Sequence, residues 1–173
     1  LDEDGAVVET LEPLGGFDNY AIGVDFHDDG RLLAAGGADG TVRVWDVSDP
    51  SAVEPVGRMA GPTDQVYSVA WQPEGSLLAG ASLDGSVWLW DLSQPPRPDL
   101  RANLLGLPGD VYSVTFSPDG SQVAAAGSSR SVRFWDADPA EAVERICAVS
   151  GTRLSRAEWS RYVPGAPYSP PCT

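Results

Sequence analysis

The sequence predicts an all-β protein assembled from three copies of one repeated unit. Residues 66–91 (VYSVAWQPEGSLLAGASLDGSVWLWD) align without gaps with residues 21–46 and with residues 111–136, each time at an offset of 45 positions. A Trp-Asp pair ends each copy, and the three pairs are Trp45–Asp46, Trp90–Asp91 and Trp135–Asp136. A period in this range is typical of the four-stranded blades of a β-propeller.

Each copy is expected to form three strands joined by two tight turns. In the middle copy, the β-branched and aromatic run 66–71 predicts the first strand. Gln72-Pro73-Glu74-Gly75 has Pro and Gly where a type I turn favours them, and strand 76–82 is expected after it. Leu83-Asp84-Gly85, in which Gly tolerates a positive φ, is a second turn leading into strand 86–91.

The segments between the copies are expected to supply the outer, fourth strand of a blade. Residues 47–60 and 92–105 contain Pro, which an edge strand tolerates. The second strand of every copy is rich in Ala and Gly, which predicts close backbone approach between neighbouring blades. Packing between blades is the interpretation favoured for the aromatic side chains Trp71, Trp88, Trp90 and Phe116.

The motifs V-x-S-V, S-P-D-G, D-G-[ST]-V and Trp-Asp resemble those of the WD-repeat (WD40) β-propeller family. The resemblance implies a partial propeller of three four-stranded blades at residues 15–136. It also implies structural roles for the Trp-Asp pairs and for Asp39 and Asp84 in the turns.

The sequence differs from the family at the residues of one polar network. The histidine that follows glycine at the start of a family repeat, and joins a network with the turn Asp and a strand Trp, is replaced by Phe17, Pro62 and Leu107. The third copy also has Ser129-Arg130 where the others have Asp-Gly. We therefore expect these blades to depend on packing more than on buried polar networks.

Both ends of the chain depart from the repeat. Residues 1–14, which start without an initiator Met, align with an outer strand and are expected to complete a preceding blade. Residues 137–173 are expected to form a short helical and Pro-rich tail, with helices near 139–149 and 156–162. This tail is similar to the ends of large actinobacterial WD-repeat proteins, many of which carry a STAND-type NTPase upstream.

Three blades are fewer than the roughly 4–8 that close a propeller. We therefore expect the rest of a longer propeller, or a second copy, to complete the ring. The net charge of −14, with no Lys, argues against nucleic-acid binding and against direct binding to anionic membranes. It leaves open whether acidity serves solubility or a basic partner.

Few residues suggest chemistry. His27 is the only histidine and is expected to be a solvated turn residue, so no catalytic residue, metal site or cofactor is predicted. Cys147 and Cys172 form either a disulfide that holds the tail or two reduced thiols. The compartment stays open: reduced thiols favour the cytoplasm, and a disulfide an extracytoplasmic location.

The strongest functional prediction concerns position. In the family, residues near the start of each first strand rim the top of the central channel, a face that commonly binds peptides. The corresponding residues here are Tyr20, Ile22, Gln65, Tyr67, Asp110 and Tyr112. We expect a non-enzymatic surface that binds a protein or peptide, with a role only in capping the rim as the alternative reading of the tyrosines. A structural module for ring closure or self-assembly is the alternative function, and a propeller hydrolase or lyase is the least favoured.

Overall fold

The structure, a computed structural model, describes residues 13–94 and 97–137. These residues form strands and no helix. The first sheet contains β1 (Ala21–Phe26), β2 (Leu32–Gly37), β3 (Val42–Asp46) and β4 (Glu54–Met59). The second contains β5 (Val66–Trp71), β6 (Leu77–Ser82), β7 (Val87–Asp91) and β8 (Asp99–Leu104). The third contains β9 (Val111–Phe116), β10 (Gln122–Gly127) and β11 (Val132–Asp136).

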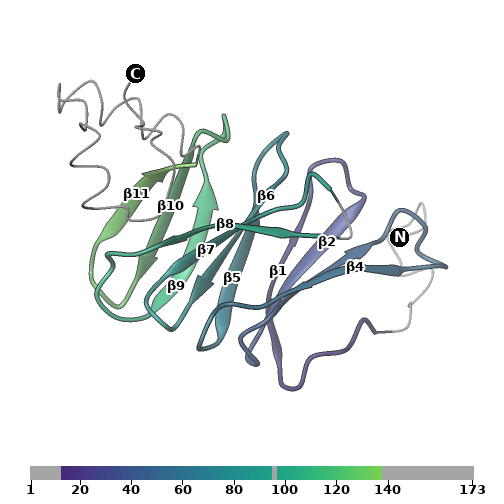
Figure 1. Cartoon of the computed structure of the whole chain (residues 1–173), viewed down its shortest axis with the longest axis horizontal. Coiled ribbons are helices and arrows are strands. Elements are labelled where there is room, and N and C mark those ends of the chain that lie inside the picture. Colours follow the sequence, from purple (N-terminus) through teal and green to yellow (C-terminus); the bar gives the residue numbers. More distant parts are fainter. Residues whose placement is uncertain (1–12, 95–96, 138–173) are drawn as a thin grey trace, which may run out of the picture. The chain divides into compact units, whose positions relative to one another are not determined.

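Every sheet is an antiparallel meander in chain order, so each is one blade (Figure 1). The predicted all-β partial propeller is confirmed, and the outer strands β4 and β8 lie within the segments expected to contain them. The third sheet has three strands among the described residues.

The chain divides into two compact units, Leu1–Trp135 and Asp136–Thr173. The predicted strand in residues 1–14 lies almost wholly outside the described residues. The predicted tail helices and Cys147 and Cys172 lie outside them entirely.

Two of the turns differ from their expected form. The Gly75 N–H bonds the Gln72 carbonyl at 3.2 Å, but Glu74 has a φ of 53°, which is not the negative φ of a type I turn. In the tight turns of the first two blades, Gly40 and Gly85 take positive φ as expected. In the third blade Arg130 takes this conformation at φ 60°, which costs about 1–2 kcal/mol for a residue with a Cβ.

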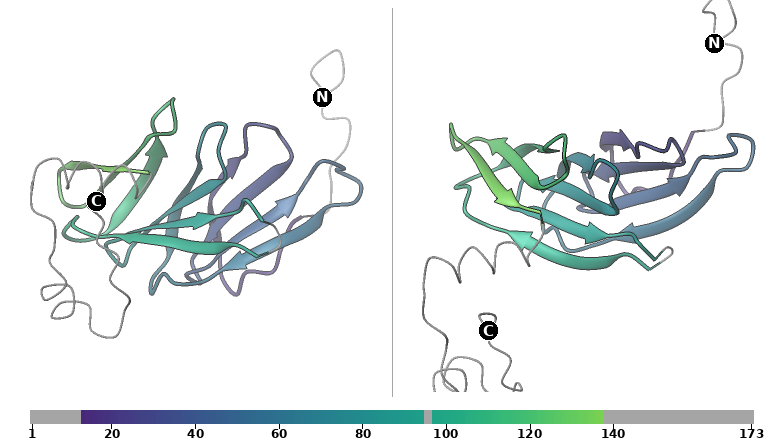
Figure 2. Two further views of the ribbon diagram at one scale, coloured as in Figure 1. Left: turned by 45° about the horizontal axis from the view of Figure 1, so that its top comes forward. Right: turned by 90° about the horizontal axis from the view of Figure 1, so that it is seen from above.

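The first strands lie side by side near the centre of the arrangement. β5 contacts both β1 and β9, and it also contacts β2 of the preceding blade (Figure 2). A buried apolar cluster lies at the boundary between the first two blades. It joins Val66, Val69 and Trp71 of the second blade to side chains of the first, namely Ala34, Val42, Val44 and Met59.

Glycines make this close approach possible, as the sequence predicts. A Cβ on Gly36 would lie 2.8 Å from both the Val66 carbonyl oxygen and its Cγ1. A Cβ on Gly23 would lie 2.8 Å from the Tyr67 carbonyl oxygen and 2.9 Å from the Ser68 Cα. Neighbouring first strands are thus within backbone contact distance.

Gly23→Ala is expected to destabilise the protein by about 1–3 kcal/mol, because its methyl group meets the backbone of the next blade and not a flexible side chain. Urea unfolding followed by tryptophan fluorescence measures the change. Gly15→Ala is the matched control, since nothing lies within 4 Å of its Cβ, and it should be neutral or slightly stabilising. Equal effects of the two substitutions would contradict the close approach.

Candidate binding rim

A β-bulge occurs at the same place in all three first strands. Pairing with the second strand skips one residue between Ala21 and Gly23 in the first blade. It skips one again between Val66 and Ser68, and between Val111 and Ser113. The skipped residues are Ile22, Tyr67 and Tyr112. Because a bulge redirects a side chain out of the regular ladder, this device sets the direction of three of the predicted rim residues.

The structure brings two of the predicted residues together. The rings of Tyr67 and Tyr112 meet edge to face, with centroids 5.6 Å apart and planes at 64°. Both side chains remain more than 40% exposed although they touch. The Tyr112 hydroxyl donates to the Asp110 carboxylate at 3.0 Å, which raises the pKa of Tyr112. The pair is therefore an exposed aromatic surface shared by the second and third blades.

Three of the other predicted rim residues form backbone hydrogen bonds with a turn of their own blade. The carbonyls of Tyr20, Gln65 and Asp110 accept bonds of 2.8–3.0 Å from backbone N–H groups in the turn between the second and third strands. Tyr20 is 78% exposed and makes no ring contact with another described residue. Ile22 is partly buried.

A polar network around Asp84 fixes this end of the second blade. One carboxylate oxygen accepts from the Ser86 N–H and hydroxyl. The other accepts from the Thr63 N–H at 3.0 Å and the Trp88 indole N–H at 3.2 Å. Burial raises the pKa of Asp84, but these donors outweigh burial and hold the pKa below its usual value.

The first blade has a similar network, centred on Asp39. Its carboxylate accepts from the Thr41 N–H and hydroxyl, and from the Asp18 N–H at 3.1 Å. Polar networks therefore accompany packing in these two blades, and their bonds are exposed or partly buried. The sequence lacks the family's histidine in both blades. A backbone N–H, that of Asp18 in the first blade and of Thr63 in the second, donates to the turn Asp instead. In the third blade Ser129 pairs with Ser131 instead.

The Trp-Asp pairs lie at the end of each third strand. Trp45 and Trp90 are buried, and the Arg133 guanidinium lies 5.8 Å from the partly buried Trp135 ring. The Ser48 hydroxyl and N–H, followed by Arg31, hold the pKa of Asp46 at about 2. Asp91 accepts from Ser93 and Ser76, and Asp136 is partly buried.

The opposite ends of the first strands carry bonds between blades that repeat every 45 residues. His27 Nε2 donates to the Gly75 carbonyl at 2.9 Å, and Gln72 Nε2 donates to the Gly120 carbonyl at 2.8 Å. The His27 side chain is only 16% exposed and its ring meets Trp71 edge to face at 5.0 Å. The expectation of a solvated turn residue is wrong, since His27 joins two blades.

Burial works against protonation of His27, but its neighbours favour it. The Gly75 carbonyl and the Asp29 carboxylate, 2.9 Å from Nδ1, together raise the pKa of His27 above its usual value. In the neutral ring, the Asp29 N–H can donate to Nδ1 at 3.3 Å instead.

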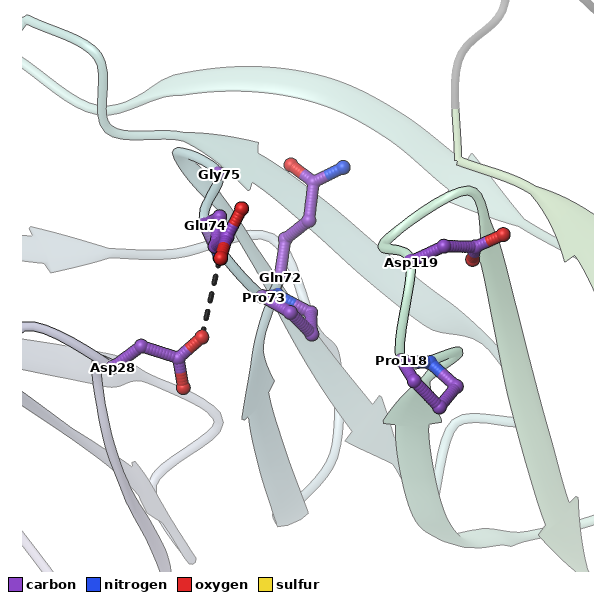
Figure 3. A pocket seen from close by; sticks show the side chains of 7 residues that line it. All are labelled: Asp28, Gln72, Pro73, Glu74, Gly75, Pro118 and Asp119. Carbon is purple, nitrogen blue, oxygen red and sulfur yellow. Dashed lines mark hydrogen bonds between the residues drawn. The ribbon is translucent and has the colours of Figure 1, made fainter.

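A shallow, solvent-open depression of about 500 Å³ lies at this end of the blades (Figure 3). Asp28, Glu74 and Asp119 give it an anionic lining, with Gln72 between the Asp28–Glu74 contact and Asp119. Asp28 accepts from the Glu74 N–H at 3.2 Å. The hydroxyl of Ser117, followed by the N–H and hydroxyl of Ser121, holds the pKa of Asp119 at about 2.

Within residues 13–94 and 97–137, no set of three or more His, Cys, Asp or Glu side chains is arranged to hold a metal ion. The same residues contain no helix of the length and apolarity needed to cross a membrane.

Three antiparallel blades with a bulged first strand define a repeat protein of the β-propeller class. The family model "WD domain, G-beta repeat" (WD40) matches residues 11–46, 53–91 and 102–136. The chain therefore belongs to the WD40-repeat family, whose domains generally mediate protein–protein interaction and are typically not enzymes. No match to the chain was found among curated proteins.

Asp84→Asn is expected to lower the free energy of unfolding at pH 7 by about 1–2 kcal/mol, because an amide N–H₂ then faces existing donors. Since the pKa of Asp84 is lowered on folding, its stabilisation is present above the unfolded pKa and is lost as pH falls through the folded pKa. The difference from wild type should therefore narrow below about pH 4. Urea unfolding across pH measures it.

Asp64→Asn is the control for Asp84→Asn. The Asp64 carboxylate accepts from the N–H of its neighbour Gln65 at 2.7 Å, a bond that an amide oxygen can keep. A cost equal to that of Asp84→Asn would contradict a specific network around Asp84.

His27→Ala is expected to cost about 1 kcal/mol by removing the bond to the Gly75 carbonyl. Because the pKa of His27 is raised on folding, its extra stabilisation is fully present below about pH 6.5 and is lost as pH rises through the folded pKa. His27→Gln should keep the bond, as Gln72 does, but lose this pH dependence. The measurement is thermal unfolding of the wild type and both variants from pH 5.5 to 8.5. The same dependence of Tm on pH in all three proteins would contradict the bond between His27 and the next blade.

Proposed function

We propose that the chain is a non-enzymatic protein-interaction module that binds a peptide segment of its partner at the rim. The bulged, touching and exposed pair Tyr67 and Tyr112 is the observation that carries this proposal. The other proposed contacts are Tyr20, Ile22, Gln65 and Asp110, which share the same end of the blades.

Tyrosine suits such a surface because it offers a large, rigid contact area with few rotatable bonds and a polar tip. Here the ring–ring contact and the bond from the Tyr112 hydroxyl to Asp110 restrict the side chains before any partner arrives. Restriction of this kind lowers the entropy lost on binding. The backbone beneath them is fixed by the bulges and by the neighbouring turn bonds.

The charge of the chain favours a basic partner. The net charge is −14, and Asp110 lies beside the tyrosine pair. Complementary charge increases the rate of association and selects among partners more than it adds affinity. We therefore propose a peptide that combines an apolar or aromatic anchor with Lys or Arg.

We further propose that this surface serves as a scaffold or sensor within a larger regulatory protein. The similarity of the segment RICAVSGTRLSRAEWSRYVPGAPYSPPC to the ends of large actinobacterial WD-repeat proteins supports this context, and the STAND-type NTPase belongs to it by analogy alone.

The test is selection of a displayed peptide library on the purified chain, followed by fluorescence anisotropy with the selected peptides. Tyr67→Ala and Tyr112→Ala should each weaken binding at least tenfold, since central aromatic contacts contribute about 2 kcal/mol or more. Tyr112→Phe should have a smaller effect, because it removes only the bond to Asp110. Binding should weaken as salt rises if the selected peptides are basic.

Leu100→Ala is the matched control, an exposed apolar residue on the outer strand β8, away from the rim. It should leave the affinity unchanged. Selected peptides that bind the Tyr67→Ala/Tyr112→Ala double variant as tightly as wild type would overturn the rim as the binding site.

A further inference from the structure

The tyrosine pair, Tyr67 and Tyr112, is an aromatic surface beside a carboxylate that has no cation. The two side chains are 44% and 43% exposed, and their rings meet edge to face. The Tyr112 hydroxyl donates to Oδ2 of Asp110 at 3.0 Å, which leaves Oδ1 able to accept from a partner. Within residues 13–94 and 97–137, no cationic side chain pairs with Asp110 or lies over either tyrosine ring. The rim thus combines an aromatic surface with a negative charge that no described residue neutralises.

Elsewhere in the described part of the chain, arginine fills both kinds of position. The Arg43 guanidinium lies 5.1 Å from the centre of the Phe17 ring. Arg31 pairs with the Asp46 carboxylate at 2.9 Å. The tyrosine pair and Asp110 bring both environments to one place, so a guanidinium from another molecule would find both contacts there.

The arrangement of the two rings keeps an aromatic face free. In an edge-to-face contact, the ring that contributes its edge keeps both of its faces uncovered by its neighbour. The face of an aromatic ring carries negative charge, and a phenol that donates to a carboxylate is polarised toward more negative charge on its ring. Such a face attracts a cation that lies within about 6 Å of its centre. The exposed side of the pair therefore favours a cation.

The same arrangement favours arginine over lysine. A guanidinium is flat, so it can stack on the Tyr112 ring while an N–H at its edge donates to Oδ1 of Asp110. The ammonium group of lysine is compact and strongly hydrated, so it loses more hydration on contact with a ring and cannot stack on it.

We propose that the cationic residue of the bound peptide is an arginine, whose guanidinium stacks on Tyr112 and donates to Asp110. This inference rests on the proposed function, since it names the side chain that occupies the tyrosine pair. Tyr67 supports the Tyr112 ring from the side through the edge-to-face contact. The net charge of −14 attracts either basic residue, whereas stacking selects arginine.

The test compares three displayed libraries of random peptides on the purified full chain, which differ only in a fixed central Arg, Lys or Leu. The Arg library should be enriched most. Fluorescence anisotropy then measures the effect of replacing the Arg of a selected peptide with citrulline, which has the same shape and no charge. Citrulline should weaken binding about tenfold, because an exposed cation–π contact and an exposed ion pair each contribute less than a tenfold factor. Lys should weaken it about threefold, because it keeps the charge but loses the stacked contact.

Two variants locate the bound arginine. In Asp110→Asn, which keeps an oxygen for the Tyr112 hydroxyl, the cost of citrulline should shrink from about tenfold to about threefold. Tyr112→Leu keeps apolar area without an aromatic face and should reduce the cost of citrulline similarly. Asp119→Asn is the matched control, because it removes one negative charge at the opposite end of the blades, and it should leave the cost unchanged. Thermal unfolding midpoints near that of wild type would show that the variants remain folded.

The outcomes separate this inference from the proposed function. Selected peptides that bind Tyr67→Ala/Tyr112→Ala weakly, but lose no affinity with citrulline or Lys, would overturn the arginine and leave the rim as the binding site. Equal changes in the cost of citrulline in Asp110→Asn and Asp119→Asn would also overturn it. Peptides that bind the double variant as tightly as wild type would overturn both.

Discussion

Apolar contact between the first strand of one blade and the inner face of the blade before it is the interaction on which the rest of the structure depends. Val66, Val69 and Trp71 belong to one buried cluster with Val42 and Val44 of the first blade. A blade is thin, so it can bury apolar side chains only against another blade. Small residues in the second strands and Gly23 in the first follow from that requirement, because larger ones would separate the backbones.

Most of the fold could be predicted from the sequence because the repeat compares the chain with itself. Residues 66–71 were expected as a strand and form β5, and the Gly85 turn takes the positive φ expected of it. Details that depend on a neighbouring blade could not be read this way. His27 looks like a turn residue in its own copy, and only the position of Gly75 in the next blade makes it a bridge. The sequence contained one sign of this role. His27 and Gln72 occupy the same position in successive repeats, and both side chains are long enough to donate a hydrogen bond to the next blade.

The candidate site was proposed from the register of the repeats, which does not give its geometry. The sequence proposes Tyr67 and Tyr112 as rim residues, whereas the bulges at these residues and the contact between their rings are seen only in the structure. The donors to Asp84 were not predicted for a related reason. A missing histidine was taken to mean a missing donor, yet the Thr63 N–H reaches the carboxylate without any side chain. Every residue except Pro has a backbone N–H, so the sequence cannot show which of these groups will reach a carboxylate.

The two ends of a first strand therefore differ in structural role: the start carries an exposed, bulged residue and the end packs on the neighbouring blade. At the start of the strand, the bulge leaves one residue out of the pairing with the second strand and turns its side chain away from the sheet. The contact with the preceding blade is made further along the strand, by Val69 and Trp71, so the bulge does not disturb it. At the end, Trp71 is buried and its N–H and neighbouring turn are bonded to the first blade through Asp25 and His27. Rigid packing at one end lets the other end present exposed tyrosines without loss of order. A surface of this kind can change its side chains, and so its partner, while the contacts that hold the blades together stay the same.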